Sequence, residues 1–142
     1  MRLISIPPLN DAYFHLNQAK GLPVISSAKE LRRVYSTSCI LLSWIAMEVS
    51  IADCTKKLLA KGQLTVASSK GLLESAARLA VFGRSALDTE TFRRLRRMRN
   101  EIVHPRIDDR DVDLPVSLPS ETFDFCAQVI QDFYRPTKLI LR

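Results

Sequence analysis

Hydrophobic residues recur at helical spacing along most of the chain, and this pattern predicts a helical bundle. The longest pattern follows Ser27 and Glu30, which have the spacing of a capping box, and continues to about residue 61. Further helical patterns cover residues 69–82 and 88–103, with Asp88 as the expected N-cap, and a last one lies between Ser120, also an expected N-cap, and Pro136. Four substantial helices with short to moderate connections predict an all-α fold, an antiparallel bundle of four to five helices.

The length of the chain predicts one domain. Its 142 residues match the common size of a single domain, which would span residues 1–142. Residues 1–25 contain three prolines and a glycine around a short helical pattern at 10–19, so we expect an arm that lies on the main body. Residues 105–119 contain four aspartates and are expected to form an exposed acidic loop.

The long predicted helix carries two neighbouring apolar stripes. One stripe alternates steps of three and four residues and includes one carboxylate, Glu48, and the second stripe lies beside it. The first consists of Leu31, Val34, Ser38, Leu41, Ile45, Glu48, Ala52, Thr55 and Leu59, and the second of Ile40, Trp44, Met47, Ile51, Cys54 and Leu58. A helix that is apolar over so much of its circumference needs two packing surfaces to cover it. It is either the central helix of one bundle or gives part of its surface to a dimer interface.

Composition indicates a cytoplasmic globular protein without a membrane segment. Hydrophobic residues make up 46% of the chain and charged residues 25%, and the four glycines argue against a turn-rich β fold. The N-terminal apolar run is too short for a signal peptide, and the apolar stretch Cys39–Met47 meets Glu48 well before the roughly 20 residues of a membrane span. The three cysteines are far apart and form no CxxC pair, so we expect buried thiols, no metal site and no cofactor.

The basic charge is concentrated in one segment. A net charge of +6 favours a polyanionic partner such as RNA or DNA, and residues 93–106 contain six arginines. At about 100° per residue, Arg93, Arg97, Asn100 and His104 align on one side of the predicted helix, whereas Arg99 falls at the border of its apolar face. The expected RNA-binding residues are Arg93, Arg96, Arg97 and Arg106.

The same segment contains the groups that a phosphodiester cleavage site without a metal would use. An arginine guanidinium can hold two phosphate oxygens, Asn100 can orient a substrate oxygen, and His104 can take and give a proton near neutral pH. One histidine cannot serve both ends of a phosphate at the same instant, so a second donor is needed. His15 is available, but two-fold dimerisation would bring a second His104 into the same groove, and we favour the dimer.

The segment contains the hexapeptide Arg99-Asn100-Glu101-Ile102-Val103-His104. This hexapeptide resembles the signature of the HEPN superfamily, in which an arginine, a polar residue and three further residues precede a histidine. The resemblance covers about residues 27–135 and implies a small helical bundle that dimerises so that paired motifs line a cleft. It also implies a metal-independent endoribonuclease of a toxin–antitoxin, defence or RNA-processing system.

On the pattern of this family, Arg99 would hold the scissile phosphate, Asn100 would support the site, and His104 would transfer protons. The products would carry 2′,3′-cyclic phosphate and 5′-hydroxyl ends, and a toxin would have an antitoxin protein as its partner. Other members bind RNA, nucleotide or a protein partner without known cleavage activity, and the signature does not separate the two groups.

Each candidate residue also has a structural interpretation. His104 before Pro105 can simply end the helix and complement its dipole, and the arginines can form a solvated face. Glu48 lies among apolar positions, so we expect it to pair with Arg99 or another arginine, either structurally or in support of the site. Trp44 is expected in the core or in an interface rather than as a platform for base stacking.

Overall fold

The computed structural model describes residues 2–4, 6–23, 25–60, 90–104, 115–134 and 139–141. This part of the chain is mostly helical, which confirms the all-α class. In chain order, its elements are β1 (Arg2–Ile4), α1 (Pro7–Gly21), a 3-10 turn (Ser26–Ala28), α2 (Lys29–Ala60), α4 (Glu90–Val103), α5 (Leu118–Tyr134) and β2 (Leu139–Leu141). The predicted helix at 69–82, the predicted cap Asp88 and most of the predicted acidic loop lie outside the described residues.

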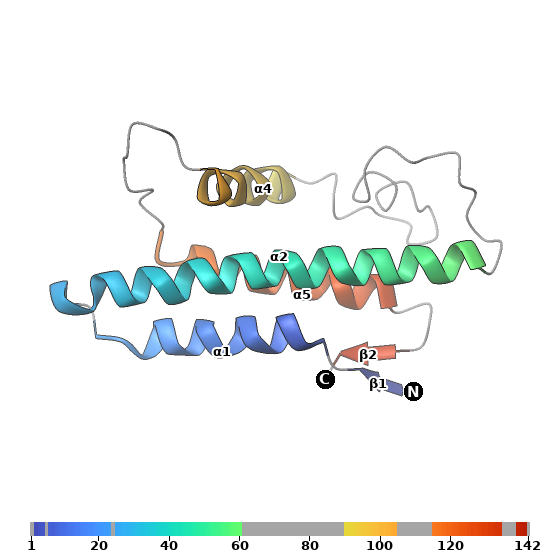
Figure 1. Ribbon diagram of the computed structural model, residues 1–142, viewed down its shortest axis with the longest axis horizontal. Coiled ribbons are helices and arrows are strands. Elements are labelled where there is room, and N and C mark those ends of the chain that lie inside the picture. Colours follow the sequence, from blue (N-terminus) through green and yellow to red (C-terminus); the bar gives the residue numbers. More distant parts are fainter. Residues whose placement is uncertain are drawn as a thin grey trace.

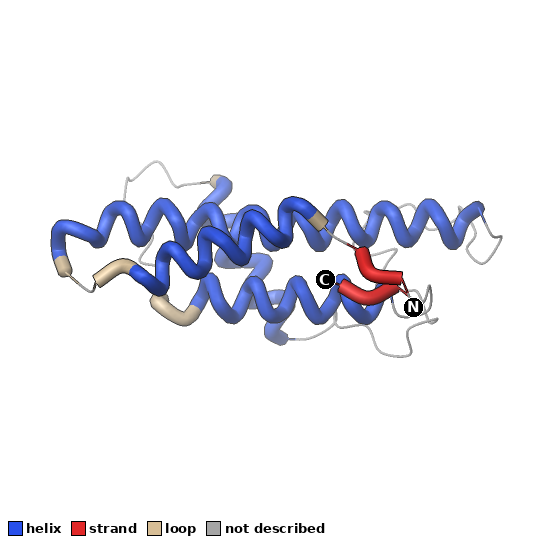
Figure 2. Tube along the Cα trace, turned by 90° about the horizontal axis from the view of Figure 1, so that it is seen from below, coloured by secondary structure: helices blue, strands red, loops and turns tan. Residues whose placement is uncertain are grey.

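Helix α2 is the central element of the bundle. Helix α5 lies beside it, and α1 and α4 lie on opposite sides of this pair (Figure 1). Figure 2 shows the molecule from the side of α1, which lies across both α2 and α5. Helices α1 and α2 run in opposite directions, whereas α2 and α5 run in the same direction. The predicted antiparallel arrangement therefore holds for the first pair and is wrong for the second.

The N-terminal residues form a complete layer of the bundle. Helix α1 begins with prolines in its first turn, where the missing N–H of proline costs no helical hydrogen bond. It is longer than the predicted helix at both ends. Its buried side chains recur at helical spacing and are Leu9, Ala12, Leu16 and Ala19. The predicted arm is therefore a helix that packs against the bundle along its length.

A short pair of parallel strands lies at the ends of the described chain. In this pair, Arg2 lies opposite Leu139 and Ile4 lies opposite Leu141. The strands bring the N- and C-terminal segments together (Figure 1). The sequence did not predict them, because three residues are too few for an alternating pattern and their pairing is not local in sequence.

Two predicted helix starts are wrong. Ser27 lies inside the 3-10 turn, and α2 begins at Lys29, so Ser27 and Glu30 do not form the expected capping box. Helix α5 begins at Leu118, which lies before the predicted cap Ser120 and inside the predicted acidic loop. In both cases a backbone turn leads into the helix, and sequence spacing alone does not distinguish such a turn from a side-chain cap.

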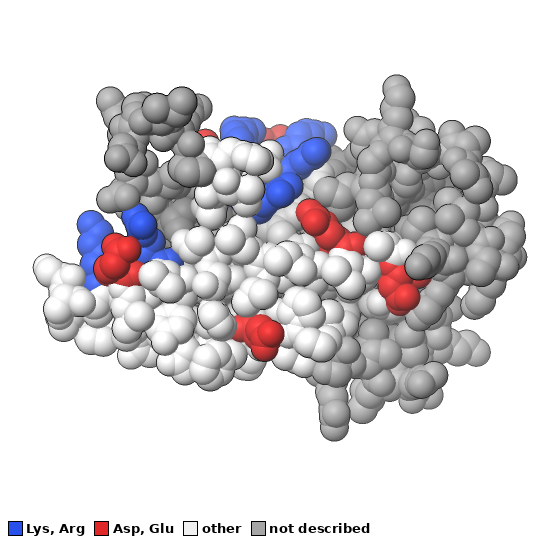
Figure 3. Space-filling model, in the orientation of Figure 1, with Lys and Arg blue, Asp and Glu red and all other residues white. Residues whose placement is uncertain are grey.

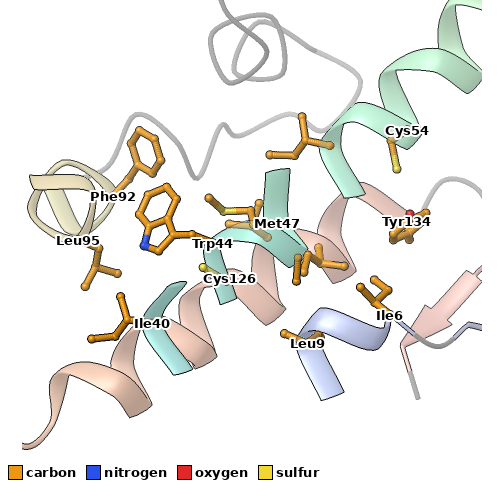
Figure 4. Packing of buried hydrophobic residues seen from close by; sticks show 14 of the residues in the cluster. Ile6, Leu9, Ile40, Trp44, Met47, Cys54, Phe92, Leu95, Cys126 and Tyr134 are labelled. Atoms are coloured by element: carbon orange, nitrogen blue, oxygen red, sulfur yellow. The ribbon is translucent and has the colours of Figure 1, made fainter. Parts of the chain in front are cut away.

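The second apolar stripe of α2 forms the core. Ile40, Trp44, Met47, Ile51 and Cys54 are at most 2% exposed. They pack with buried residues of α4 and α5, and Figure 4 shows this cluster from close by. The other stripe faces outward in large part. The exposed apolar side chains of α2, which we call the outer row of α2, are Leu31, Val34, Ile45 and Val49.

Helix α2 also passes a length and composition test for a membrane span. Residues 26–54 have a mean hydropathy of 1.5 over the best window, and 44% of that window is buried inside the bundle. The sequence argument that Glu48 interrupts the apolar stretch is therefore too strict. The core helix of a soluble bundle passes the same test, so this finding is weak evidence for a membrane.

Candidate functional site

Helix α4 carries the candidate site and is strongly amphipathic. Phe92 and Leu95 are buried against α2, and Met98 and Ile102 are partly buried beside them. The opposite side consists of exposed polar residues, as the sequence predicted. We call these residues the outer row of α4, and they are Arg93, Arg97, Asn100 and His104. The amide of His104 donates to the carbonyl of Asn100 at 2.8 Å, so helical hydrogen bonding continues to the histidine.

The arginines of α4 differ in their partners. Arg93 forms an ion pair with Glu90 of the same helix at 3.4 Å, and Arg94 forms one with Glu121 of α5. Arg96 and Arg97 are exposed and have no acidic partner among the described residues. Figure 3 shows these basic side chains over α4 at the upper edge of the molecule, above a largely uncharged surface. The outer side of α4 therefore presents positive charge that a phosphate backbone can approach.

Arg99 lies on the inner side of α4, toward α2. Its guanidinium carbon is 5.3 Å from the centre of the Trp44 ring, which is a cation–π contact. The Nε atom of Arg99 is buried and has no hydrogen-bond partner in the described part of the chain. The expected ion pair with Glu48 is absent among the described residues, and Glu48 itself is half buried on α2.

Trp44 is a core residue of α2 that also lies against α4. Its side chain is 2% exposed, which confirms the predicted place in the core. Its ring centre is 5.8 Å from that of Phe92, and Figure 4 shows the indole pointing from α2 toward α4, next to Phe92 and Leu95. The indole Nε1 is buried without a hydrogen-bond partner in the described structure. No sequence pattern indicates its contact with Arg99, because the two residues lie on helices far apart in the chain.

Within one chain, the motif arginine and histidine point in different directions. Arg99 and His104 are five residues apart, which corresponds to about 140° around a helix axis. Arg99 faces α2 and is half buried, whereas His104 is exposed at the end of α4 with Asn100 on the same side. Arg106 lies outside the described residues. One chain therefore groups Asn100 and His104 with the arginines of the outer row and separates Arg99 from them.

The cysteines lie in the buried interfaces between the helices. All three are buried and free. Burial raises the pKa of Cys39 to about 11 and raises the pKa of Cys126 still further above that of an ordinary thiol. Both thiols therefore stay protonated at neutral pH and are poor nucleophiles. Among the described residues, no three side chains of histidine, cysteine or acidic type lie close enough to hold a metal ion.

Comparison with known proteins gives no relative for this chain. No family model matches it, and neither the curated proteins nor the solved structures contain a match.

Proposed function

We propose that this protein is a metal-independent endoribonuclease of the HEPN type. The observation that carries the proposal is the environment of Arg99. This arginine is half buried against an indole and has no carboxylate partner in the described structure. A guanidinium held in this way keeps its N–H donors for an anionic ligand, and a phosphodiester is the anion that the neighbouring basic surface favours. Asn100 and exposed His104 follow in the same motif.

The proposed reaction is an internal transfer at phosphorus. The 2′-oxygen of a ribose attacks the adjacent phosphorus and loses its proton to one histidine. The bond between phosphorus and the 5′-oxygen breaks, and that oxygen takes a proton from a second histidine. The products are a 2′,3′-cyclic phosphate and a 5′-hydroxyl. Arg99 would stabilise the charge that develops on the phosphate oxygens.

The proposed active unit is a dimer, because one chain cannot complete this site. His104 is the histidine of the motif, and Arg99 points away from it within the same helix. A two-fold pairing supplies a second copy of both residues to one groove. The outer row of α2 supports a partner surface, since Leu31, Val34, Ile45 and Val49 are 46–54% exposed. In this proposal the protein acts on RNA in the cytoplasm, as a toxin with an antitoxin protein or as a defence or processing enzyme.

The test is incubation of the purified protein with mixed RNA in the presence of a chelator, followed by analysis of the fragment ends. We expect cleavage with cyclic phosphate and 5′-hydroxyl ends. His104→Ala and Arg99→Ala should each lower the rate by about 10²- to 10⁴-fold without loss of folding. The control is Lys20→Ala, which removes an exposed cation from α1 on the opposite side of the bundle from α4. Cleavage that survives both motif substitutions would contradict the assignment of these residues.

A second candidate function is a module that binds RNA, nucleotide or a protein partner without cleaving RNA. The observation that favours it is the separation of Arg99 from His104 within one chain. Under this alternative, substrate RNA stays intact in every incubation, while binding weakens with salt and with the loss of Arg97. End-group analysis therefore distinguishes the two functions more directly than a binding constant does.

A further inference from the structure

We propose that Trp44 is a positioning residue that holds Arg99 in place for the phosphate of the RNA substrate. The inference rests on the proposed function and extends it to a residue of the core. It starts from two facts of the interface between α2 and α4. The guanidinium of Arg99 lies over the indole, and the described structure provides no acidic group to hold it.

The chemical nature of the partner decides what Arg99 can still bind. A carboxylate would neutralise the guanidinium and occupy its N–H donors in a bidentate pair, so that a phosphate would have to displace it. The face of an indole attracts the cation through its ring quadrupole and leaves those donors in the guanidinium plane unused. Trp44 can thus fix the position of the charge without competing for the ligand.

The surroundings of Trp44 make it a rigid support. The indole is almost fully buried, and Phe92 and Leu95 of α4 lie next to it. Phe92 in turn lies 6.2 Å from the ring of Phe125 on α5, so the indole lies in a core to which three helices contribute. Nε is the buried, unpartnered atom of Arg99, and neither terminal nitrogen has an acceptor in the described part of the chain. These two nitrogens are the atoms that we assign to phosphate.

The first test uses substitutions of Trp44 with a matched control at the same interface. We expect Trp44→Leu to lower the affinity for RNA by about 3- to 30-fold, and Trp44→Phe to lower it less, because a phenyl ring keeps part of the attraction. The control is Phe92→Leu, which also removes a ring next to Trp44 but keeps an apolar side chain there and leaves the indole beneath the Arg99 guanidinium. Its affinity should stay near that of the wild type once the folded fraction is taken into account.

A double-mutant cycle shows whether Trp44 acts through Arg99. In an Arg99→Ala background, Trp44→Leu should have no further effect on RNA affinity. Equal losses from Trp44→Leu and Phe92→Leu, or an unchanged effect of Trp44→Leu in the Arg99→Ala background, would overturn the proposal. Since either core variant can lose stability, a second measurement on proteins with an intact Trp44 is needed.

That measurement is the fluorescence of Trp44, which is the only tryptophan of the chain. The probe is a 2′-O-methyl oligoribonucleotide, which lacks the nucleophile for cleavage. Its binding should change the emission of the wild type and leave the emission of Arg99→Ala unchanged. Absence of binding, or the same emission change in both proteins, would overturn the role of Trp44. An Arg99-dependent emission change without cleavage of ordinary RNA would reject the nuclease and retain the phosphate site.

Discussion

The interfaces that α2 forms with α5 and with α4 differ in the hydrogen-bond partners of their polar groups. On the side of α5, the hydroxyl of Tyr134 donates to Asp53 at 3.0 Å, and the thiol of Cys39 donates to the carbonyl of Pro119 at 3.7 Å. On the side of α4, the buried nitrogens Nε1 of Trp44 and Nε of Arg99 have no hydrogen-bond partner among the described residues, and the same holds for the Ser50 hydroxyl elsewhere on α2.

We infer from this contrast that the interface with α5 serves mainly stability and that the interface with α4 serves mainly ligand binding. A buried donor without an acceptor costs on the order of 1–3 kcal/mol, so an interface that contains two of them is not optimised for stability alone. The α5 side is therefore the place where substitutions should change folding, and the α4 side is the place where they should change ligand binding.

The largest expected effect is on the α5 side. Ile130 is fully buried in the core cluster between α2 and α5. Ile130→Ala should lower the free energy of unfolding by about 2–5 kcal/mol, because it removes buried methyl groups and leaves a cavity. Chemical denaturation measures this change. If RNA affinity per folded molecule falls as strongly as it does in Arg99→Ala, the proposed division between the two interfaces is wrong.

The sequence predicted the inner and outer sides of single helices well. The alignment of Arg93, Arg97, Asn100 and His104 follows from helical spacing alone, and the exposure of all four confirms it. On α2 the sequence predicted two apolar stripes but not which of them is buried, and the structure buries the second one for the positions up to Cys54.

Contacts between helices were not predictable in this way. Glu48 was the obvious partner for Arg99 because it is a carboxylate among apolar positions. The structure places Arg99 over Trp44 instead, and no local pattern encodes which face of α2 meets α4. The strand pair and the backbone turns before α2 and α5 were missed for a related reason, since each depends on contacts or turns that leave little trace in hydrophobic spacing.

Alkaline pH provides a second test of the α5 side. Burial raises the pKa of Cys39 to about 11 and also raises the pKa values of Cys126 and Tyr134. Above pH 9, thiols of the unfolded chain lose protons that the folded chain retains, so the free energy of unfolding should fall as pH rises. Below pH 9 the contribution is fully present. Between pH 8 and pH 10.5 the free energy of unfolding should fall by about 2 kcal/mol for each of the two thiols, and Cys126→Ala should reduce the difference. A flat profile would contradict the burial of these groups.

On the α4 side, the outer row should affect binding and leave stability unchanged. Arg97 is exposed and has no acidic partner in the described structure. Arg97→Ala should weaken RNA binding a few-fold and lower the slope of log affinity against log salt by about 0.7, the value for one phosphate contact on a single strand. The free energy of unfolding should stay within about 0.5 kcal/mol of the wild type. Lys20→Ala on α1 is the control, and an equal change in its slope would mean that binding responds to net charge alone.

The smallest expected effect concerns the ion pair that joins α4 to α5. Arg94 and Glu121 have side chains that are 45% and 38% exposed, so solvent screens their attraction. Glu121→Gln should lower the free energy of unfolding by only about 0.2–1 kcal/mol. The same change should raise RNA affinity slightly, because Arg94 loses its carboxylate and becomes available to phosphate.

The expected changes in stability and in RNA affinity therefore have opposite signs. This difference distinguishes an effect on the packing of α4 against α5 from an effect of the charge on the surface of α4. A double-mutant cycle with Arg94→Ala isolates the coupling between the two side chains. If Glu121→Gln instead lowers both stability and RNA affinity, then this ion pair, and not the contact of α4 with Trp44, sets the position of the proposed RNA-binding helix.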